Sequence, residues 1–146
     1  MTADQLEEAE ASVARGDLAE LERRTRLEAV TRSLSTGEVA ELLGIDVSRV
    51  RHRKAKDGLY AFPVGTKLRF PTWQFTDAPE QRVLPGLTAV VRAIPDDMRA
   101  PSVLGVMTTP QEDLLIDGAQ VTPPEWLASG GDPQAVVDIL EGSLQS

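Results

Sequence analysis

Residues 35–58 constrain the fold most, because they predict two short helices joined by a tight turn. Ser35–Glu38 reads Ser-Thr-Gly-Glu, a capping box in which a serine oxygen accepts an orphan amide and a glutamate reaches back. Gly44 can take the left-handed conformation that ends the first helix. Asp46 or Ser48 can cap a second helix, which Gly58 would close. The stretch therefore predicts a compact helical pair.

The spacing within this pair is that of a helix-turn-helix. A small residue, Ala40, stands where the second helix must approach the first, and Gly44 follows four residues later. The residues placed to fill the space between the helices are apolar: Val39, Leu43, Ile45 and Val50. An ordinary helical hairpin would show the apolar residues, but it would not need this alanine and glycine followed by a basic second helix.

Charge sets the second helix apart from the rest of the chain. Residues 46–76 hold seven cations and two acids, a local charge of +5, whereas the whole chain of 146 residues carries −8. Such asymmetry indicates that one segment meets a polyanion while the rest has another role. The alternative is a basic helix face that only contacts solvent.

At 100° per residue, Val50 points toward the first helix, whereas the outward face is cationic or hydrogen-bonding. Such a helix fits the DNA major groove, where arginine binds guanine O6 and N7. We expect Arg51, at the flank, and Ser48, near the helix start, to contact phosphate. The predicted DNA contacts on this helix are Ser48, Arg49, Arg51, His52, Arg53 and Lys56. A single histidine on a basic helix favours a DNA contact or a plain surface residue over a metal ligand or catalytic base.

A small β-hairpin is predicted next, from residues 59–62 and 67–70 around a Pro-Val-Gly-Thr turn. Lys67 and Arg69 would share one face of their strand and lie along the DNA backbone or minor groove. Trp73 and Phe75 are expected to cover the core rather than to stack on bases.

The segment LSTGEVAELLGIDVSRVRHRKAKDGLYAFPVGTKLRFPTWQF resembles the winged helix-turn-helix of MerR-like and excisionase-like DNA-binding domains. This resemblance implies double-stranded DNA as the partner. The wing is shorter than in typical MerR proteins, and no effector-binding domain of that family is evident. Both departures argue against a ligand-sensing activator.

The remaining parts of the chain are predicted to be helical. Residues 1–33 form an extension with a possible break at Gly16; its narrow apolar stripe can pair with a second copy or belong to a partly frayed tail. Residues 77–84 are a predicted linker. Residues 85–146 alternate short helices with an irregular stretch over 108–122, where Leu114, Leu115 and Ile116 are expected to face inward.

The segment MTTPQEDLLIDGAQVTPPEWLASGGDPQAVVDILEGSL is similar to the toxin-binding domain of Xre/ParS-type antitoxins, the partners of RES-domain toxins. The matched positions include Thr109, Gly118, Thr122, Trp126 and Leu140. The resemblance implies a partner surface formed by Trp126 and by the tail, Glu141, Gly142, Ser143, Leu144, Gln145 and Ser146. That family usually has an N-terminal Xre-like helical bundle, whereas this chain has the predicted helix-turn-helix and β-hairpin in its place.

Several function classes find no support in the sequence. There is no cysteine, no glycine-rich phosphate loop with lysine, no apolar run long enough for a membrane span, and no signal peptide. We expect no enzyme activity, cofactor or metal, and a cytoplasmic protein that is nucleoid-associated when bound to DNA. A hydrolase using paired acids such as Asp96 and Asp97 is a remote alternative.

The sequence thus predicts a mainly α protein: a helical extension (1–33), a winged helix-turn-helix with a small β-hairpin (34–76), a linker (77–84) and a helical interaction module (85–146). The leading hypothesis is a homodimeric repressor that acts as an antitoxin against a RES-like toxin. One alternative is a DNA-binding regulator that has no toxin and dimerises through the C-terminal module. Another is an adaptor whose basic helix docks on an acidic protein.

Overall fold

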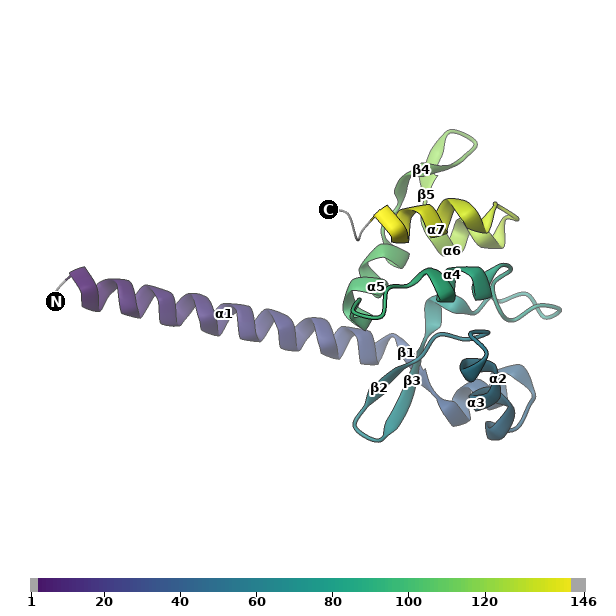
Figure 1. Cartoon of the computed structure of the whole chain (residues 1–146), viewed down its shortest axis with the longest axis horizontal. Helices are drawn as coiled ribbons and strands as arrows, with labels where there is room; N and C mark the ends of the chain where they lie inside the picture. The colour runs from purple at the N-terminus through teal and green to yellow at the C-terminus, as the bar shows by residue number, and fades with distance from the viewer. Residues whose placement is uncertain (1–2, 143–146) are drawn as a thin grey trace.

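A computed structural model describes residues 3–142, with side chains from residue 16 onward. A long helix, α1 (Ala3–Thr31), projects from a body made by the rest of the chain (Figure 1). It runs through Gly16 without interruption, so the break suggested by the sequence does not occur. A lone glycine costs only about 1 kcal/mol in a helix, which flanking helix-forming residues offset.

The first half of the body combines two helices with a three-stranded antiparallel sheet. In chain order its elements are β1 (Ser33–Ser35), α2 (Thr36–Leu43), α3 (Val47–Ala55), β2 (Phe62–Val64), β3 (Lys67–Pro71) and the 3₁₀ turn η1 (Thr72–Gln74). The strand order is β1-β3-β2, with Leu34 opposite Phe70 and Pro63 opposite Leu68. A hairpin was predicted here, but its first strand is Phe62–Val64 rather than residues 59–62, so Pro63 and Val64 belong to the strand and not to the turn. Strand β1 was not predicted, because three residues between two helices show no strand alternation.

The second half contains four helices and a second hairpin. Its elements are α4 (Leu87–Ala93), α5 (Ala100–Thr108), β4 (Gln111–Ile116), β5 (Ala119–Val121), α6 (Pro123–Ala128) and α7 (Pro133–Gly142). The stretch expected to be irregular is therefore a two-stranded sheet, turning at Asp117 (φ 51°) and Gly118 (φ 81°). Only Leu114 is fully buried there; Leu115 is 52% exposed, because successive strand residues point to opposite faces.

Helix ends follow the capping chemistry of the sequence. Ser35 Oγ accepts the Glu38 amide at 3.1 Å and the Glu38 carboxylate accepts the Ser35 amide at 2.9 Å, which completes the predicted capping box. Gly44 is left-handed (φ 67°), and Asp46, rather than Ser48, caps α3. The sequence predicted that Gly58 would close α3, but the residue with left-handed backbone after this helix is Asp57 (φ 60°).

Most of the buried apolar side chains form one cluster that runs through both halves, from Val39 in α2 to Leu140 in α7. The predicted linker takes part in this packing, because Phe75 pairs with Val83 in a β-bridge and Leu84 is buried. The division at residues 77–84 stays a prediction about folding units. Helices predominate, as expected, but two small sheets make the fold mixed.

Candidate nucleic-acid interface

Helix α3 presents a cationic surface on a buried apolar anchor. Val50 is 0% exposed and joins α3 to the core, whereas every charged side chain of the helix faces solvent. The exposed polar residues are Ser48, Arg49, Arg51, His52, Arg53 and Lys54, and Lys56 follows at the C-cap. Among the described residues, none of these cations is within ion-pair distance of an acid. The described part of the chain thus provides no ion-pair partner for the positive charge of α3.

A groove of about 440 Å³ lies between α3, the start of α2 and the hairpin. Its lining includes three cations and no acid: Ser35, Thr36, Gly37, Val47, Arg51, Thr66, Lys67, Leu68 and Arg69. Glu38 stands near the groove, and hydrogen bonds from the backbone and side chain of Ser35, with a smaller effect of Arg69, hold the pKa of its carboxyl below 4.5. The groove has the charge that suits an anion such as a phosphate backbone.

The two predicted wing cations have different roles. Lys67 is exposed on the hairpin, as expected. Arg69 is half-buried: its Nε donates to Ser33 Oγ at 2.9 Å, and its Nη2 donates to Ser33 O at 2.8 Å and Val30 O at 3.4 Å. The expectation that both face outward was therefore wrong for Arg69. Arg69 thereby ties the hairpin to β1 and to the end of α1. The sequence pattern did not indicate that Arg69 would donate hydrogen bonds to these two segments.

Gln74 holds the segment between α3 and the hairpin in place, a role that no sequence pattern indicated. Its side chain is 0% exposed; Oε1 accepts the Tyr60 amide at 2.9 Å, and Nε2 donates to Tyr60 O at 2.8 Å and Pro71 O at 3.0 Å. A glutamine in a polar turn gives no pattern that predicts such burial. Trp73, 8% exposed, covers the core as predicted, with its ring 6.0 Å from that of Tyr60.

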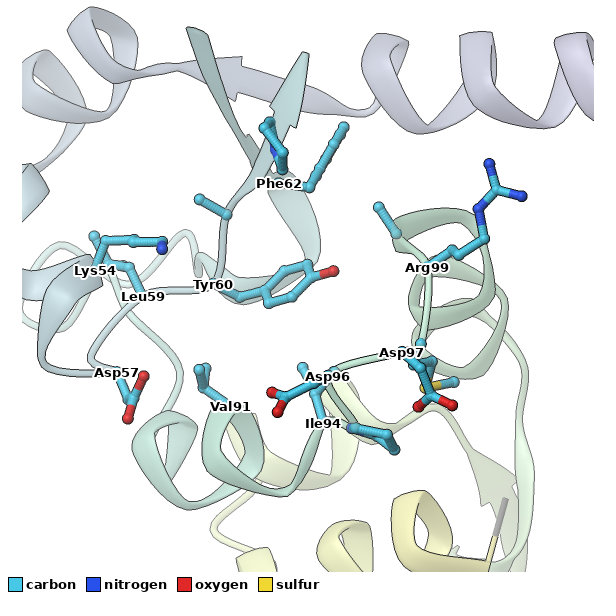
Figure 2. Close-up of a pocket in the computed structure, with 15 residues that line it drawn as sticks. Lys54, Asp57, Leu59, Tyr60, Phe62, Val91, Ile94, Asp96, Asp97 and Arg99 are labelled. Atoms are coloured by element: carbon cyan, nitrogen blue, oxygen red, sulfur yellow. The ribbon is translucent and has the colours of Figure 1, made fainter. Parts of the chain in front are cut away.

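A second cavity, of about 480 Å³, separates the α3–hairpin segment from the α4–α5 loop (Figure 2). The Tyr60 ring projects across it, with Asp96 and Asp97 on the opposite wall. Burial raises the pKa of the Tyr60 phenol above 10.0. Arg92 of α4 lies 3.5 Å from Asp57, so an exposed ion pair joins α4 to the end of α3 beside this cavity. The described residues include no group of three or more His, Cys, Asp or Glu side chains placed to hold a metal ion.

The predicted partner surface is only partly described. Trp126 is half-buried; its Nε1 donates to Asp132 O at 2.9 Å and its ring lies against Gly131, where an added Cβ would come within 2.3 Å. Trp126 therefore orders the turn between α6 and α7. Glu141 and Gly142 are exposed at the end of α7. Ser143, Leu144, Gln145 and Ser146 lie outside the described residues.

Comparison with known proteins yields one informative similarity. No family model matches the chain, and no curated protein matches it. Among solved structures the chain is similar to the NMR structure of Rv2175c, with a TM-score of 0.55 and 25% identity over 76% of this chain and 80% of that one. The two proteins therefore share most of their architecture. No helix among the described residues has the length and apolar character needed to cross a bilayer.

Proposed function

We propose that this protein binds double-stranded DNA sequence-specifically through a winged helix-turn-helix formed by residues 34–76, and acts as a dimeric transcriptional repressor. The observation that supports this most is the surface of α3, whose exposed cations form no ion pair with any described acid and adjoin a groove lined by three cations. A row of exposed cations beside a basic groove is the electrostatic pattern expected of a surface that binds a polyanion.

In this proposal α3 enters the major groove. Arg49 and Arg53, one helical turn apart on the exposed side, bind base edges, and bidentate contacts to guanine give the specificity. Ser48 and Arg51 contact phosphate, and Lys67 on the hairpin contacts the flanking backbone. Arg69 acts indirectly, by holding the hairpin in place.

The test is DNA affinity of the full chain, measured by fluorescence anisotropy on a site selected from random duplexes. We expect Arg49→Ala with Arg53→Ala to weaken specific binding about 30-fold or more, since each bidentate contact contributes ~1–3 kcal/mol. The matched control, Arg92→Ala with Arg99→Ala, removes the same charge from α4 and the start of α5 and should retain most of the affinity. Equal affinities for the two double variants would refute the role of α3.

Salt dependence separates DNA binding from an adaptor role. Phosphate contacts release counterions, so the logarithm of affinity should fall steeply and linearly with the logarithm of salt concentration. A flat response, together with binding to an acidic protein, would favour the adaptor alternative.

The C-terminal module is proposed to bind a protein, and a RES-like toxin is the partner that its sequence resemblance implies. An exposed leucine on β4, Leu115, and the exposed end of α7 favour a protein contact here. Deleting residues 141–146 should spare DNA binding and release the toxicity of a co-expressed neighbouring gene product. If that product is harmless alone, the antitoxin role fails and a regulator without a toxin remains.

A further inference from the structure

Helix α1 extends from the body with an apolar face that nothing in the described chain covers (Figure 1). Leu18 and Leu21 are each 60% exposed, and their positions lie 60° apart around the helix. Ala29 is only 20° from Leu18 in projection, yet it is buried where α1 packs on α5. The side of α1 that docks on the body therefore continues outward with Leu18 and Leu21 exposed, whereas Leu27, 58% exposed, lies 180° from Leu18.

Charge divides α1 into two unlike halves. Residues 3–13 contain four acids and no cation, whereas residues 23–31 contain three arginines and one glutamate, and Arg32 directly follows the helix. Contacts within the helix use some of the arginines, because Glu20 pairs with Arg23 and Arg24, and Glu28 pairs with Arg32. These are exposed pairs, which contribute only a few tenths of a kcal/mol each. Such weak pairs do not prevent these arginines from pairing with acids of a partner.

We propose that α1 is the dimerisation element and packs antiparallel against α1 of a second copy, with the crossing point near Leu18. Antiparallel packing sets the acidic half of each helix against the arginine-rich half of the other, and brings the Leu18–Leu21 faces together. A parallel pair would oppose like charges at both ends. The antiparallel pair has a two-fold axis, so one surface is complementary to itself, as a closed homodimer requires.

This arrangement places the two bodies at opposite ends of the paired helices. The ends of α1 that join the bodies lie 13 residues from Leu18, so they are ~40 Å apart at 1.5 Å per residue. In Figure 1, α2 and α3 lie away from the projecting end of α1, which leaves α3 free. If the proposed DNA binding holds, the half-sites are then more than one helical turn apart, since one turn is about 34–36 Å.

Cysteine cross-linking tests the pairing in the absence of DNA. The chain has no cysteine, so each variant carries a single thiol. Positions 11, 18 and 25 share one helix face because they are seven residues apart. Under mild oxidation, Leu18→Cys should form disulfide-linked dimers alone, whereas Ala11→Cys and Thr25→Cys should link only when mixed. Leu115→Cys, exposed on β4, should not link.

Two outcomes would overturn the proposal. Ala11→Cys and Thr25→Cys each linking alone would show parallel helices, and no linking with a monomer mass in sedimentation would exclude a dimer. Sedimentation also tests the double variant Leu18→Asp with Leu21→Asp, which should have half the mass of the dimer and a native circular dichroism spectrum. Leu115→Asp is the control and should remain a dimer. A dimer that persists in the double variant would place the interface elsewhere and would also overturn the proposal. A cross-linked dimer that binds no DNA would refute the proposed function and leave this inference standing.

Discussion

Gln74 gives the most quantitative prediction, because one buried side chain makes three hydrogen bonds. Replacing it by methionine keeps the volume and removes all three bonds, leaving the Tyr60 amide without its acceptor and the carbonyls of Tyr60 and Pro71 without a donor. An unpaired buried group costs about 1–3 kcal/mol, and buried carbonyls tolerate the loss better than amides. Methionine recovers part of this through apolar packing, so we expect a loss of about 3 kcal/mol in the free energy of unfolding.

The assay is urea unfolding followed by circular dichroism. A loss of this size is a large part of the 5–15 kcal/mol typical of a folded protein and should lower the midpoint clearly. Gln134→Met is the matched control, since its amide bonds Asp138 at 2.8 Å on the surface; it should change stability by less than about 0.5 kcal/mol. If Gln74→Met were as stable as that control, the hydrogen bonds would contribute little and the reasoning would be refuted.

Three further predictions address the hairpin, α2 and α4. Arg69→Ala should lower the free energy of unfolding by about 1–2 kcal/mol in urea, because its hydrogen bonds to Ser33 are lost. Lys67→Ala should weaken DNA binding and leave the free energy of unfolding unchanged. A stable Arg69→Ala together with a destabilised Lys67→Ala would contradict these separate roles. Ser35→Ala removes the serine hydroxyl but keeps the backbone amide that is the main cause of the lowered Glu38 pKa, so an NMR titration should show that pKa moving only part of the way toward 4.5. The stability that the ionised carboxylate contributes is present above pH 4.5 and is lost as pH falls through the lowered pKa; an unchanged pKa would refute the contribution of the hydroxyl. Gly86→Ala should lower the melting temperature, because Gly86 has φ 74° and an added Cβ would lie 2.2 Å from the proline ring at the start of α7; unchanged melting would show that this contact relaxes freely.

Local chemistry explains why the helical pair was predictable from sequence. Caps and turn residues act through neighbours in the chain, so Ser35, Glu38 and Gly44 specify where α2 begins and ends. The 100° periodicity placed Val50 inside and the cations outside for the same reason. Strand β1 and the β4–β5 hairpin were not predicted, because three to six residues with mixed polarity become strands only when a partner strand satisfies their backbone.

The sequence by itself determined the positions of the capped helices, the existence of the first hairpin and the concentration of positive charge on α3, since each depends on residues a few positions apart. Only the tertiary structure decided which cations are free. Lys67 and Arg69 lie two positions apart in β3, and the sequence pattern treats them alike. Arg69 nevertheless donates to carbonyls more than 30 residues away, while Lys67 faces solvent. The same holds for Gln74, whose burial depends on a segment 14 residues earlier in the chain. Long-range hydrogen bonds leave no local pattern, because their partners are adjacent only after the chain has folded.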